Sequence, residues 1–558
     1  MLTKKIKKEI QEVIHSYLDA SINLEEIKLE IPNDKNNGDL ATNIAFVIAK
    51  RIGRNPIELA EEVADKLKNN KFSIEAKSGF LNFTFSDQTL AELTKETIRF
   101  EKEEKKKTMV LDYSAPNIAK PFGIGHLRST IVGQAIYNIY DFCGWQCVGI
   151  NHLGDWGTQY GKLIRQIKKT NKKPEDLSIK DLEKLYVQFH KEVEENPEVE
   201  KEGRKWFKKL EEGNKEAREI WKICVEKSMK EFEKTYSLLG IEIDHNIGES
   251  FYQDKIEEVI EEAKEKEVAQ KSEGALIVDF DQEMPPAMLL KSNGGTTYFS
   301  RDLATVKYRI KRWNPDLFVY EIGADQKLHM RQLFKTVEML GWAKEDDFMH
   351  VAHGMYRLKS GAMSTRKGQT IHLEDVLDKA IKKATRIIEK SELNKELSKE
   401  KKNKIAKKIG VGAVKYADLK NHFKKDIVFD WEKVMSLNGN SGPYLQYTTL
   451  RAKSVLEKIE KDVKFQIEDL SDEERDILRK IIEFDQVLEI AKDNFTPSTL
   501  ANFSYQLAKK FNTFYAQRSI LDAENQELKN QRLAITKATF ITLEKVLVIL
   551  GIPLPERM

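Results

Sequence analysis

The stretch that decides the fold covers residues 110–130 and reads VLDYSAPNIAKPFGIGHLRST. It opens in a short apolar strand, residues 109–111, and closes in a helix, residues 127–140, that keeps its apolar side chains on one face. The loop between them contains Gly123 and Gly125, where a ring or a phosphate group can approach the backbone because no Cβ intervenes. Since the free N–H groups and the dipole of a helix N-terminus attract anions, the stretch predicts a phosphate-binding turn.

His126 begins the predicted helix and could donate to a phosphate oxygen, although a plain strand–helix turn with a core histidine has the same pattern. The loop resembles the HIGH motif of class I aminoacyl-tRNA synthetases, and the longer string DYSAPNIAKPFGIGHLRST resembles the arginyl-tRNA synthetase family. The same resemblance extends to NHLGDWG at 151–157, GM at 354–355, MSTRKG at 363–368, GPYLQY at 442–447 and PERM at 555–558. Because these motifs span most of the chain in one order, the match is specific.

The bulk properties set limits on partners and compartment. The chain has 558 residues, enough for three or four domains, and its 93 Lys and Arg against 90 Asp and Glu leave a net charge of +3. A polyanion must therefore meet local basic patches rather than a global field. None of the 3 cysteines lies in a CxxC pair, so we expect no structural metal and no disulfide.

We expect a cytoplasmic protein without a membrane partner. Its N-terminal residues lead into a charged amphipathic helix rather than an apolar signal segment. The longest apolar run near the end, residues 546–550, is far too short to cross a bilayer. We expect the protein to be a monomer.

The chain divides into four expected regions of a multidomain α/β protein. Residues 1–104 read as an N-terminal α+β domain. Residues 108–375 alternate strands and helices, as a Rossmann-type, doubly wound parallel sheet does, with a helical insertion at about 165–271. Residues 376–435 form a helical, basic connecting region, and residues 440–558 form an all-helical bundle. The resemblance implies that the first domain contacts the tRNA elbow and that the bundle binds the anticodon.

Several individual elements follow from local patterns. Alternation over residues 80–86 predicts a strand, and residues 38–43 are expected to begin a helix. Residues 296–299 are expected to form a strand that ends near Tyr298, ahead of a helix. Further strands of the parallel sheet are expected at 148–150, 317–322 and 348–352.

Three polar side chains lie where ligands gather in a parallel sheet, near the carboxyl ends of strands. They are Tyr298, Asp302 and Gln326, and each could equally be structural, since an acidic residue in a first helical turn also favours the helix dipole. The resemblance implies that these three contact the arginine side chain, with His329 as a weaker candidate. It also implies that the polar end of arginine is held by Asp112, Ser114, Asn117 and His152.

The resemblance further implies an ATP site and the course of the reaction. The expected ATP-binding residues are Pro116, Phe122, Gly123, Gly125, His126, Gly354, Met355, Met363 and Ser364, and ATP would enter with Mg²⁺ as a substrate complex. The carboxylate of L-arginine attacks the α-phosphorus and pyrophosphate leaves, so that no protein nucleophile is needed and catalysis rests on positioning and charge neutralisation. Arginine then passes to the 3′-terminal ribose of tRNA(Arg) and AMP is released. Tyr515 and Met558 are the expected tRNA-binding residues.

Two departures from the class pattern affect the catalytic residues. Gly123 replaces the first histidine of HIGH, so only His126 can serve. Thr365 stands where the class has a catalytic lysine, and we expect Lys120 to supply the missing charge, with Lys367 as the alternative on the loop itself.

Two other functions are compatible with parts of this pattern. An enzyme of the same fold could adenylate another compound without tRNA, although it would have no need of the long helical C-terminal domain. A non-catalytic tRNA-binding paralogue would account for the altered signature loops.

Overall fold

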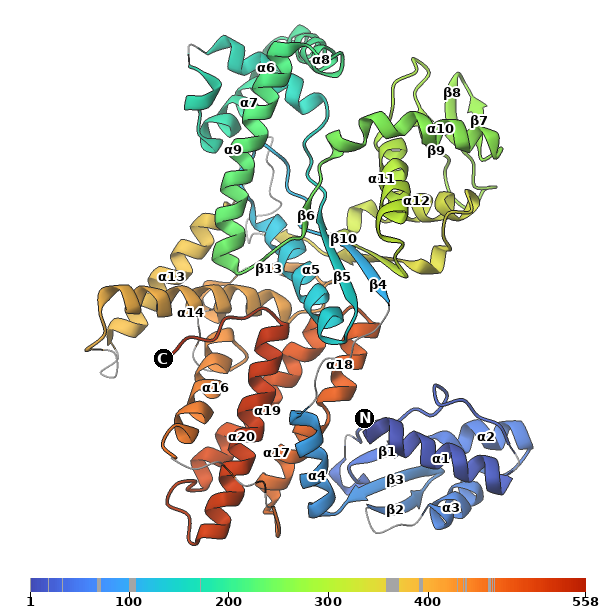
Figure 1. Cartoon of the computed structure of the whole chain (residues 1–558), viewed down its shortest axis with the longest axis vertical. Coiled ribbons are helices and arrows are strands. Elements are labelled where there is room, and N and C mark those ends of the chain that lie inside the picture. The colour runs from blue at the N-terminus through green and yellow to red at the C-terminus, as the bar shows by residue number, and fades with distance from the viewer. Residues whose placement is uncertain are drawn as a thin grey trace. The chain divides into compact units, whose positions relative to one another are not determined.

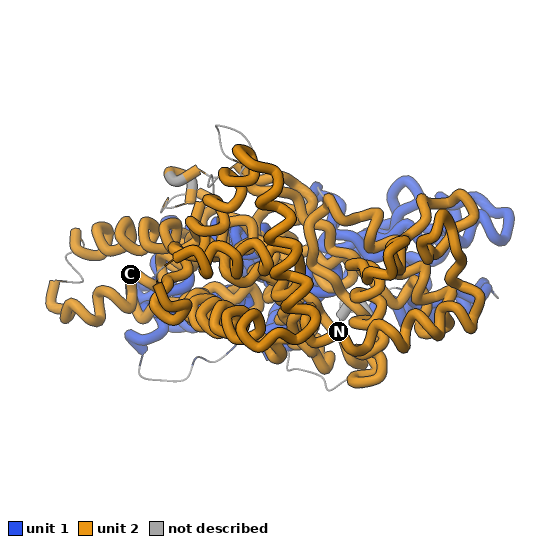
Figure 2. The backbone as a smooth tube through the Cα atoms, turned by 90° about the horizontal axis from the view of Figure 1, so that it is seen from above, with its two compact units in different colours: residues 1–101, 447–490, 502–546 blue, residues 102–446, 491–501, 547–558 orange. Residues whose placement is uncertain are grey.

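The structure is a computed structural model of the whole chain. It describes all residues except 1, 19, 33, 68–71, 100–106, 171, 358–370, 391–394, 429, 435, 437–438, 460–462, 464 and 466. The chain forms two compact units, shown in two colours in Figure 2. Unit 1 comprises residues 1–101, 447–490 and 502–546, and unit 2 comprises residues 102–446, 491–501 and 547–558.

A five-stranded parallel sheet lies at the centre of unit 2. Its strands are β4 (Thr108–Asp112), β5 (Gln146–Asn151), β6 (His245–Asn246), β10 (Leu317–Gly323) and β11 (Phe348–His353). Their order in the sheet is β11-β10-β4-β5-β6, and every pairing is parallel. The strands expected at 109–111, 148–150, 317–322 and 348–352 are confirmed. β4 reads as one apolar run because both faces of a parallel sheet are covered.

Side chains of β4 pack into the hydrophobic core on both faces of the sheet. Val110 joins a buried cluster with residues of α11 (Tyr298–Trp313) and α12 (Lys327–Met339). Met109 and Leu111 point to the opposite face, and both are fully buried. Helix α5 (Ile124–Phe142) contacts β4, β5 and β10, and its apolar face is buried as the periodicity predicts. The doubly wound fold class is confirmed by this sheet and its helices.

The segment after β5 is largely helical, as expected, and Figure 1 shows its helices gathered together. They are α6 (Thr158–Lys169), α7 (Ile179–Glu195), α8 (Glu198–Glu211) and α9 (Lys215–Leu239). The same expected insertion, residues 165–271, also contains β6 of the central sheet and part of a small antiparallel sheet. That small sheet consists of β7 (Ala269–Ser272), β8 (Ala275–Val278) and β9 (Ala287–Leu290), and α10 (Ile256–Glu265) precedes it.

The rest of unit 2 is mostly helical. Its main elements are α13 (Leu373–Lys390), α14 (Lys399–Leu419) and the parallel strand pair β12 (Tyr356–Arg357) and β13 (Ile427–Val428), followed by α15 (Trp431–Val434). The proposed division of the whole chain into four domains stays a prediction.

Unit 1 combines a three-stranded antiparallel sheet with helices from both ends of the chain. The N-terminal elements are α1 (Leu2–Leu18), β1 (Leu40–Thr42), α2 (Ile44–Ile52), α3 (Pro56–Lys66), β2 (Phe72–Lys77), β3 (Phe80–Phe85) and α4 (Asp87–Ile98). The helix expected to begin at 38–43 is wrong, because residues 40–42 pair with β3 and the helix starts at Ile44. The strand expected at 80–86 is confirmed.

The C-terminal helices complete the chain. They are α16 (Gly442–Leu456), α17 (Asp472–Ile482), α18 (Phe484–Asp493), α19 (Pro497–Gln517) and α20 (Gln526–Ile549). In the described parts of the chain, no helix combines the length and the apolar character needed to cross a bilayer.

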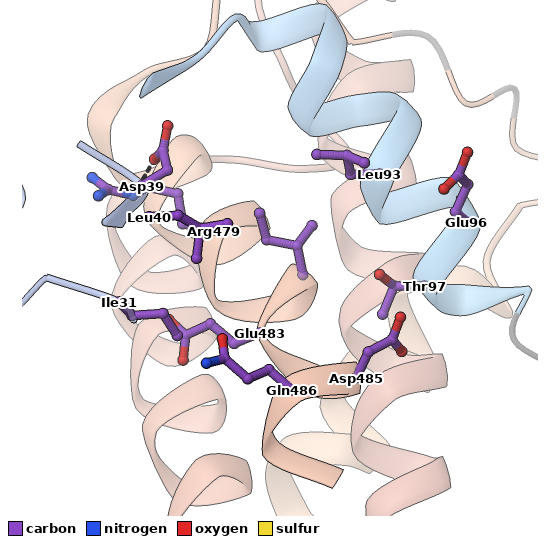
Figure 3. A pocket seen from close by; sticks show the side chains of 11 residues that line it. Ile31, Asp39, Leu40, Leu93, Glu96, Thr97, Arg479, Glu483, Asp485 and Gln486 are labelled. Carbon is purple, nitrogen blue, oxygen red and sulfur yellow. Dashed lines mark ion pairs between the residues drawn. The ribbon is translucent and has the colours of Figure 1, made fainter. Parts of the chain in front are cut away.

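A buried carboxylate fastens the N-terminal sheet to α17 inside unit 1. The Asp39 carboxylate forms ion pairs with Arg479 at 2.6 Å and with Arg475 at 3.3 Å. It also accepts a hydrogen bond from the Phe85 N–H at 2.6 Å. The cavity beside this cluster measures only about 40 Å³, and Figure 3 shows Asp39 and Arg479 joined at its edge. A space of this size holds water but no substrate, so the cluster is structural.

Candidate active site

The strand order places a topological switch point between β4 and β10. From β4 the chain adds β5 and β6 on one side, and it later returns to add β10 and β11 on the other. Ligands of open parallel sheets bind in the crevice beyond the carboxyl ends of the strands at such a point. A cavity of about 460 Å³ lies here, with Asp112 from β4 and Tyr320 and Ile322 from β10 in its wall.

Six of the seven predicted arginine-binding residues line this one cavity. They are Asp112, Asn117, His152, Tyr298, Asp302 and Gln326, and the weaker candidate His329 also lines it. The geometry thus brings together side chains that are more than 200 residues apart in sequence.

Tyr298 reaches the cavity from an element other than the one expected. The strand predicted at 296–299 is wrong, because Tyr298 is the first residue of α11 and Thr297 is its N-cap. The Thr297 hydroxyl accepts the Ser300 N–H at 3.3 Å, and the Ser300 hydroxyl accepts the Thr297 N–H at 3.1 Å. These reciprocal bonds fix the start of the helix, and they leave Tyr298 60% exposed at the cavity.

Asp302 lies one turn further along α11 and already has a partner. Its Oδ2 lies 2.6 Å from Nε2 of His329 on α12. Burial lowers the pKa of His329, but the hydrogen bond and charge of Asp302 outweigh it, so the pKa is raised above the ordinary imidazole value. Asp302 thus presents its carboxylate to the cavity while sharing it with a titratable side chain.

Sequence reasoning missed a second carboxyl group in the same cavity, that of Glu249. It lies on the 3-10 helix Glu249–Lys255 that follows β6, and it pairs with Arg301 at 2.9 Å. Burial, with the nearby charge of Asp302 as a smaller cause, raises the pKa of Glu249 to about 8, although Arg301 acts in the opposite direction. The only available signal was its position just past a central strand, and that strand is two residues long.

The cavity wall also includes one partner of a buried ion pair, Asp112. Arg309 donates from Nη2 to Oδ2 of Asp112 at 2.6 Å, and both side chains are buried. Removing either partner of a buried ion pair destabilises the folded protein, because the remaining charge would be buried without a partner. Nearby, burial lowers the pKa of His152, and its Nδ1 is buried without a hydrogen-bond partner among the described residues. His152 lines the cavity, and a neutral imidazole there can form a hydrogen bond with a polar ligand group.

Asn117 and Ser114 hold the loop between β4 and α5. Asn117 forms a bridge with Gly154, where a Cβ would lie 2.5 Å from the Asn117 Oδ1 atom. Ser114 is outside the lining of the cavity, because its hydroxyl lies 2.7 Å from Thr130 and 2.8 Å from Tyr236. The structure therefore places Ser114 in the frame behind the cavity.

The N-terminus of α5 has the features of an anion site. Gly123 is the N-cap, and a Cβ at Gly125 would meet open space. His126 is the third residue of the helix, and its Nδ1 accepts the Gly123 N–H at 3.3 Å. Burial, with Lys120 as a further cause, lowers the pKa of His126 to about 4. The ring is neutral near pH 7 and carries its proton on Nε2, which can donate to a phosphate.

Lys120 lies in the same loop, with its ammonium 4.7 Å from the ring centre of Tyr186 on α7. Two of the predicted ATP-binding residues in this loop, Pro116 and Phe122, are buried. The Phe122 ring lies 5.4 Å from that of His126 in an edge-on arrangement, so Phe122 packs behind the histidine.

The predicted adenine segment is held against α5 by one buried arginine. Arg128 donates to the carbonyl of Gly354 at 3.0 Å and forms an ion pair with Asp418. A Cβ at Gly354 would lie 2.8 Å from the backbone of Lys425, so only glycine fits there. Met355 follows with 47% exposure, as a residue that contacts a ligand would.

Some of the predicted residues cannot be placed. Met363, Ser364 and Lys367, together with Thr365, lie outside the described residues.

Of the two tRNA-binding candidates, Met558 is half-buried in unit 2. Tyr515 is 41% exposed in unit 1, and the Arg451 guanidinium lies over its ring and over that of Tyr447, at 4.9 and 4.7 Å.

Comparisons with known proteins bear on the whole chain. Residues 89–431 match the family model "tRNA synthetases class I (R), catalytic domain", residues 2–85 match "Arginyl tRNA synthetase N terminal domain", and residues 445–558 match "DALR anticodon binding domain". The chain is 42% identical to the arginine–tRNA ligase of Clostridioides difficile, with 96% of each chain covered. It is 41% identical to that of Halothermothrix orenii, with 96% and 97% covered.

Solved structures agree with these matches. The arginyl-tRNA synthetase of Plasmodium falciparum superposes with a TM-score of 0.84 at 25% identity, covering 100% of this chain and 99% of that one. The Thermus thermophilus enzyme gives a TM-score of 0.85 at 22% identity with full coverage of both chains, which supports the fold. A parallel sheet with a HIGH-like turn beside its switch point, matched by the catalytic model, defines a class I aminoacyl-tRNA synthetase. Within that class, the chain belongs to the arginyl-tRNA synthetase family.

Proposed function

We propose that this protein is an arginine–tRNA ligase whose amino acid site is the cavity at the switch point of the sheet. The observation that carries the proposal is the pair of carboxyl groups, those of Asp302 and Glu249, in a cavity that Tyr298 and Gln326 also line. Membership of the arginyl-tRNA synthetase family supports the reaction, since the relatives are named arginine–tRNA ligases.

Arginine is a distinctive ligand because its guanidinium is planar, always charged, and carries five N–H donors. Carboxylates can accept these donors in pairs, and an aromatic face can stack on the plane. Asp302 and Glu249 supply acceptors, Gln326 supplies an amide oxygen, and Tyr298 supplies the ring. Asp112, Asn117 and His152, which line the same cavity, would hold the ammonium and carboxylate of the substrate.

Activation needs positioned charges rather than a nucleophile. ATP enters with Mg²⁺, which neutralises phosphate charge when it is bound. His126 donates from Nε2 to a phosphate oxygen, and the backbone at Gly123 and Gly125 admits the phosphates to the N-terminus of α5. Lys120 would leave the Tyr186 ring to neutralise the departing pyrophosphate. Gly354 and Met355 would contact the adenine.

The second step and the tRNA contacts follow from the domain matches. Arginine passes from the adenylate to the 3′-terminal ribose of tRNA(Arg), and AMP leaves. We assign the tRNA elbow to residues 1–104 and the anticodon loop to residues 440–558, where the exposed Tyr515 ring and Met558 would contact bases. We place this activity in a cytoplasmic monomer.

Charging of total tRNA with each labelled amino acid tests the proposal against the alternatives. Arginine alone should be transferred, and transfer should require ATP. Adenylate formation without charged tRNA would instead indicate a small-molecule ligase of the same fold. Tight tRNA binding without either activity would indicate a non-catalytic paralogue.

A further inference from the structure

One face of α9 contacts the loop that joins β4 to α5. Ser228, Phe232 and Tyr236 are four residues apart, so they project from the same side of the helix. All three are buried, with exposures of 0%, 0% and 6%. The helix comes from the segment between β5 and β6, more than 100 residues after the loop it touches.

The first contact is at the middle of the loop. The Ala119 N–H donates to Ser228 Oγ at 2.8 Å, and the Ser228 hydroxyl donates in turn to the Cys224 carbonyl at 2.7 Å. One turn and two turns further along α9, the rings of Phe232 and Tyr236 each lie 5.7 Å from the ring of Phe122 in edge-on arrangements. The helix therefore contacts the part of the loop that immediately precedes His126, from Ala119 to Phe122.

The second polar contact begins a directed chain of hydrogen bonds. Thr130 donates its only hydroxyl proton to the carbonyl of His126 at 2.6 Å, so Ser114 must donate to Thr130. Ser114 must then accept from Tyr236, which in turn accepts from the amide of Asn151 at 3.1 Å. The chain runs from the end of β5, through α9 and the loop, to the first turn of α5.

The two polar contacts fall at strained positions of the loop. Ser114 has a φ of 73° and Ala119 a φ of 62°, and Ala115 between them has a φ of 42°. Residues with a Cβ avoid this left-handed region unless the surroundings hold them there. Tyr236 bonds to Ser114 and Ser228 bonds to Ala119, so α9 holds the loop at two of its three strained residues.

We propose that α9 is a positioning helix for adenylate formation, an inference that rests on the function proposed above. Ser228 and Tyr236 are its positioning residues, and they fix the loop that carries Lys120 and His126. Neither side chain lines the arginine cavity. Loss of either hydroxyl should therefore lower the rate of adenylate formation, because that step depends on the placement of the loop. Arginine binding should be unchanged.

Ser228→Ala and Tyr236→Phe each remove one hydroxyl and keep the packing of the rest of the side chain. The measurement is arginine-dependent ATP–pyrophosphate exchange with tRNA present, expressed per arginine-binding site as counted by equilibrium dialysis. Ser237→Ala is the matched control for Ser228→Ala, because it removes an exposed hydroxyl from the same helix. Tyr308→Phe on α11 is the control for Tyr236→Phe.

We expect kcat per site to fall about tenfold in each of the two variants, the scale of one lost buried hydrogen bond. The Michaelis constant for arginine should stay within about twofold of the wild type, and the controls should match the wild type. A wild-type kcat per site in both variants, with any loss of activity explained by fewer folded molecules, would overturn the proposal. So would a raised Michaelis constant for arginine at unchanged kcat. A wild-type protein without exchange activity would instead contradict the function proposed above.

Discussion

Nε2 of His329 lies 2.6 Å from Oδ2 of Asp302 on the wall of the proposed arginine cavity. The carboxylate that we assign to the substrate guanidinium is thus shared with an imidazole whose pKa is raised above its ordinary value. When His329 is protonated it pairs with Asp302 and competes with the substrate, and when it is neutral the carboxylate is available.

The Michaelis constant for arginine should therefore rise as pH falls through the raised pKa of His329. Glu249 adds a slope of the same sign, because its pKa is about 8 and protonation removes its charge. His329→Gln removes the imidazole's share and keeps that of Glu249. Steady-state kinetics between pH 6 and 9 should show a shallower dependence in this variant, and identical slopes in the two proteins would exclude His329 as a competitor.

Lys120→Ala should lower the rate of adenylate formation by on the order of 10²-fold, the scale of losing one electrostatic stabiliser of a transition state. Its effect on arginine affinity should be small, since the charge acts mainly after ATP has bound. Single-turnover adenylate formation measures this, and Thr365→Lys in the same background should restore part of the rate. If Lys120→Ala behaves as wild type while Lys367→Ala is inactive, the charge comes from the signature loop.

Tyr515→Ala should weaken the use of tRNA and leave arginine and ATP kinetics unchanged. Stacking of one base on an aromatic ring contributes about 1–3 kcal/mol, so the Michaelis constant for tRNA should rise by roughly 5- to 150-fold. Tyr515→Phe keeps the ring over Arg451 and should behave nearly as wild type. Equal defects in both variants would point to the hydroxyl and contradict stacking.

Lys415 on α14 predicts a pH-dependent stability. It is 1% exposed, donates to the Leu239 carbonyl at 2.9 Å, and has a pKa lowered by burial to about 7. Between that value and the ordinary lysine pKa of about 10.4, the unfolded chain binds more protons than the folded one, so stability rises with pH. The melting temperature of the wild type should gain on that of Lys415→Met between pH 7 and 9.5. Lys407→Met, at an exposed site on the same helix, should show no such trend; a similar trend there would refute the assignment.

The parts that the sequence predicts well are those governed by local patterns. The apolar strand β4, the glycine-bearing turn and α5 follow from residues within one short stretch. The positions of Asp302 and Gln326 near the switch point follow from a general rule about parallel sheets.

The parts that it predicts poorly depend on pairings between distant segments. The TTYF run of residues 296–299 has the composition of a strand, yet the reciprocal caps of Thr297 and Ser300 begin a helix there. Glu249 enters the cavity only because a two-residue strand, β6, joins the sheet beside β5. The contacts of α9 with Ser114 and Ala119 likewise have no local signal, since they join segments more than 100 residues apart.

The kinetic comparison of Asp302→Asn with the wild type tests the central claim most directly. The substitution keeps the shape of the side chain and removes its charge, and losing one partner of a desolvated, hydrogen-bonded ion pair costs about 2–5 kcal/mol. The Michaelis constant for arginine should rise strongly while that for ATP stays nearly constant. An unchanged Michaelis constant for arginine in a folded Asp302→Asn protein would contradict the assignment of this cavity to the arginine side chain.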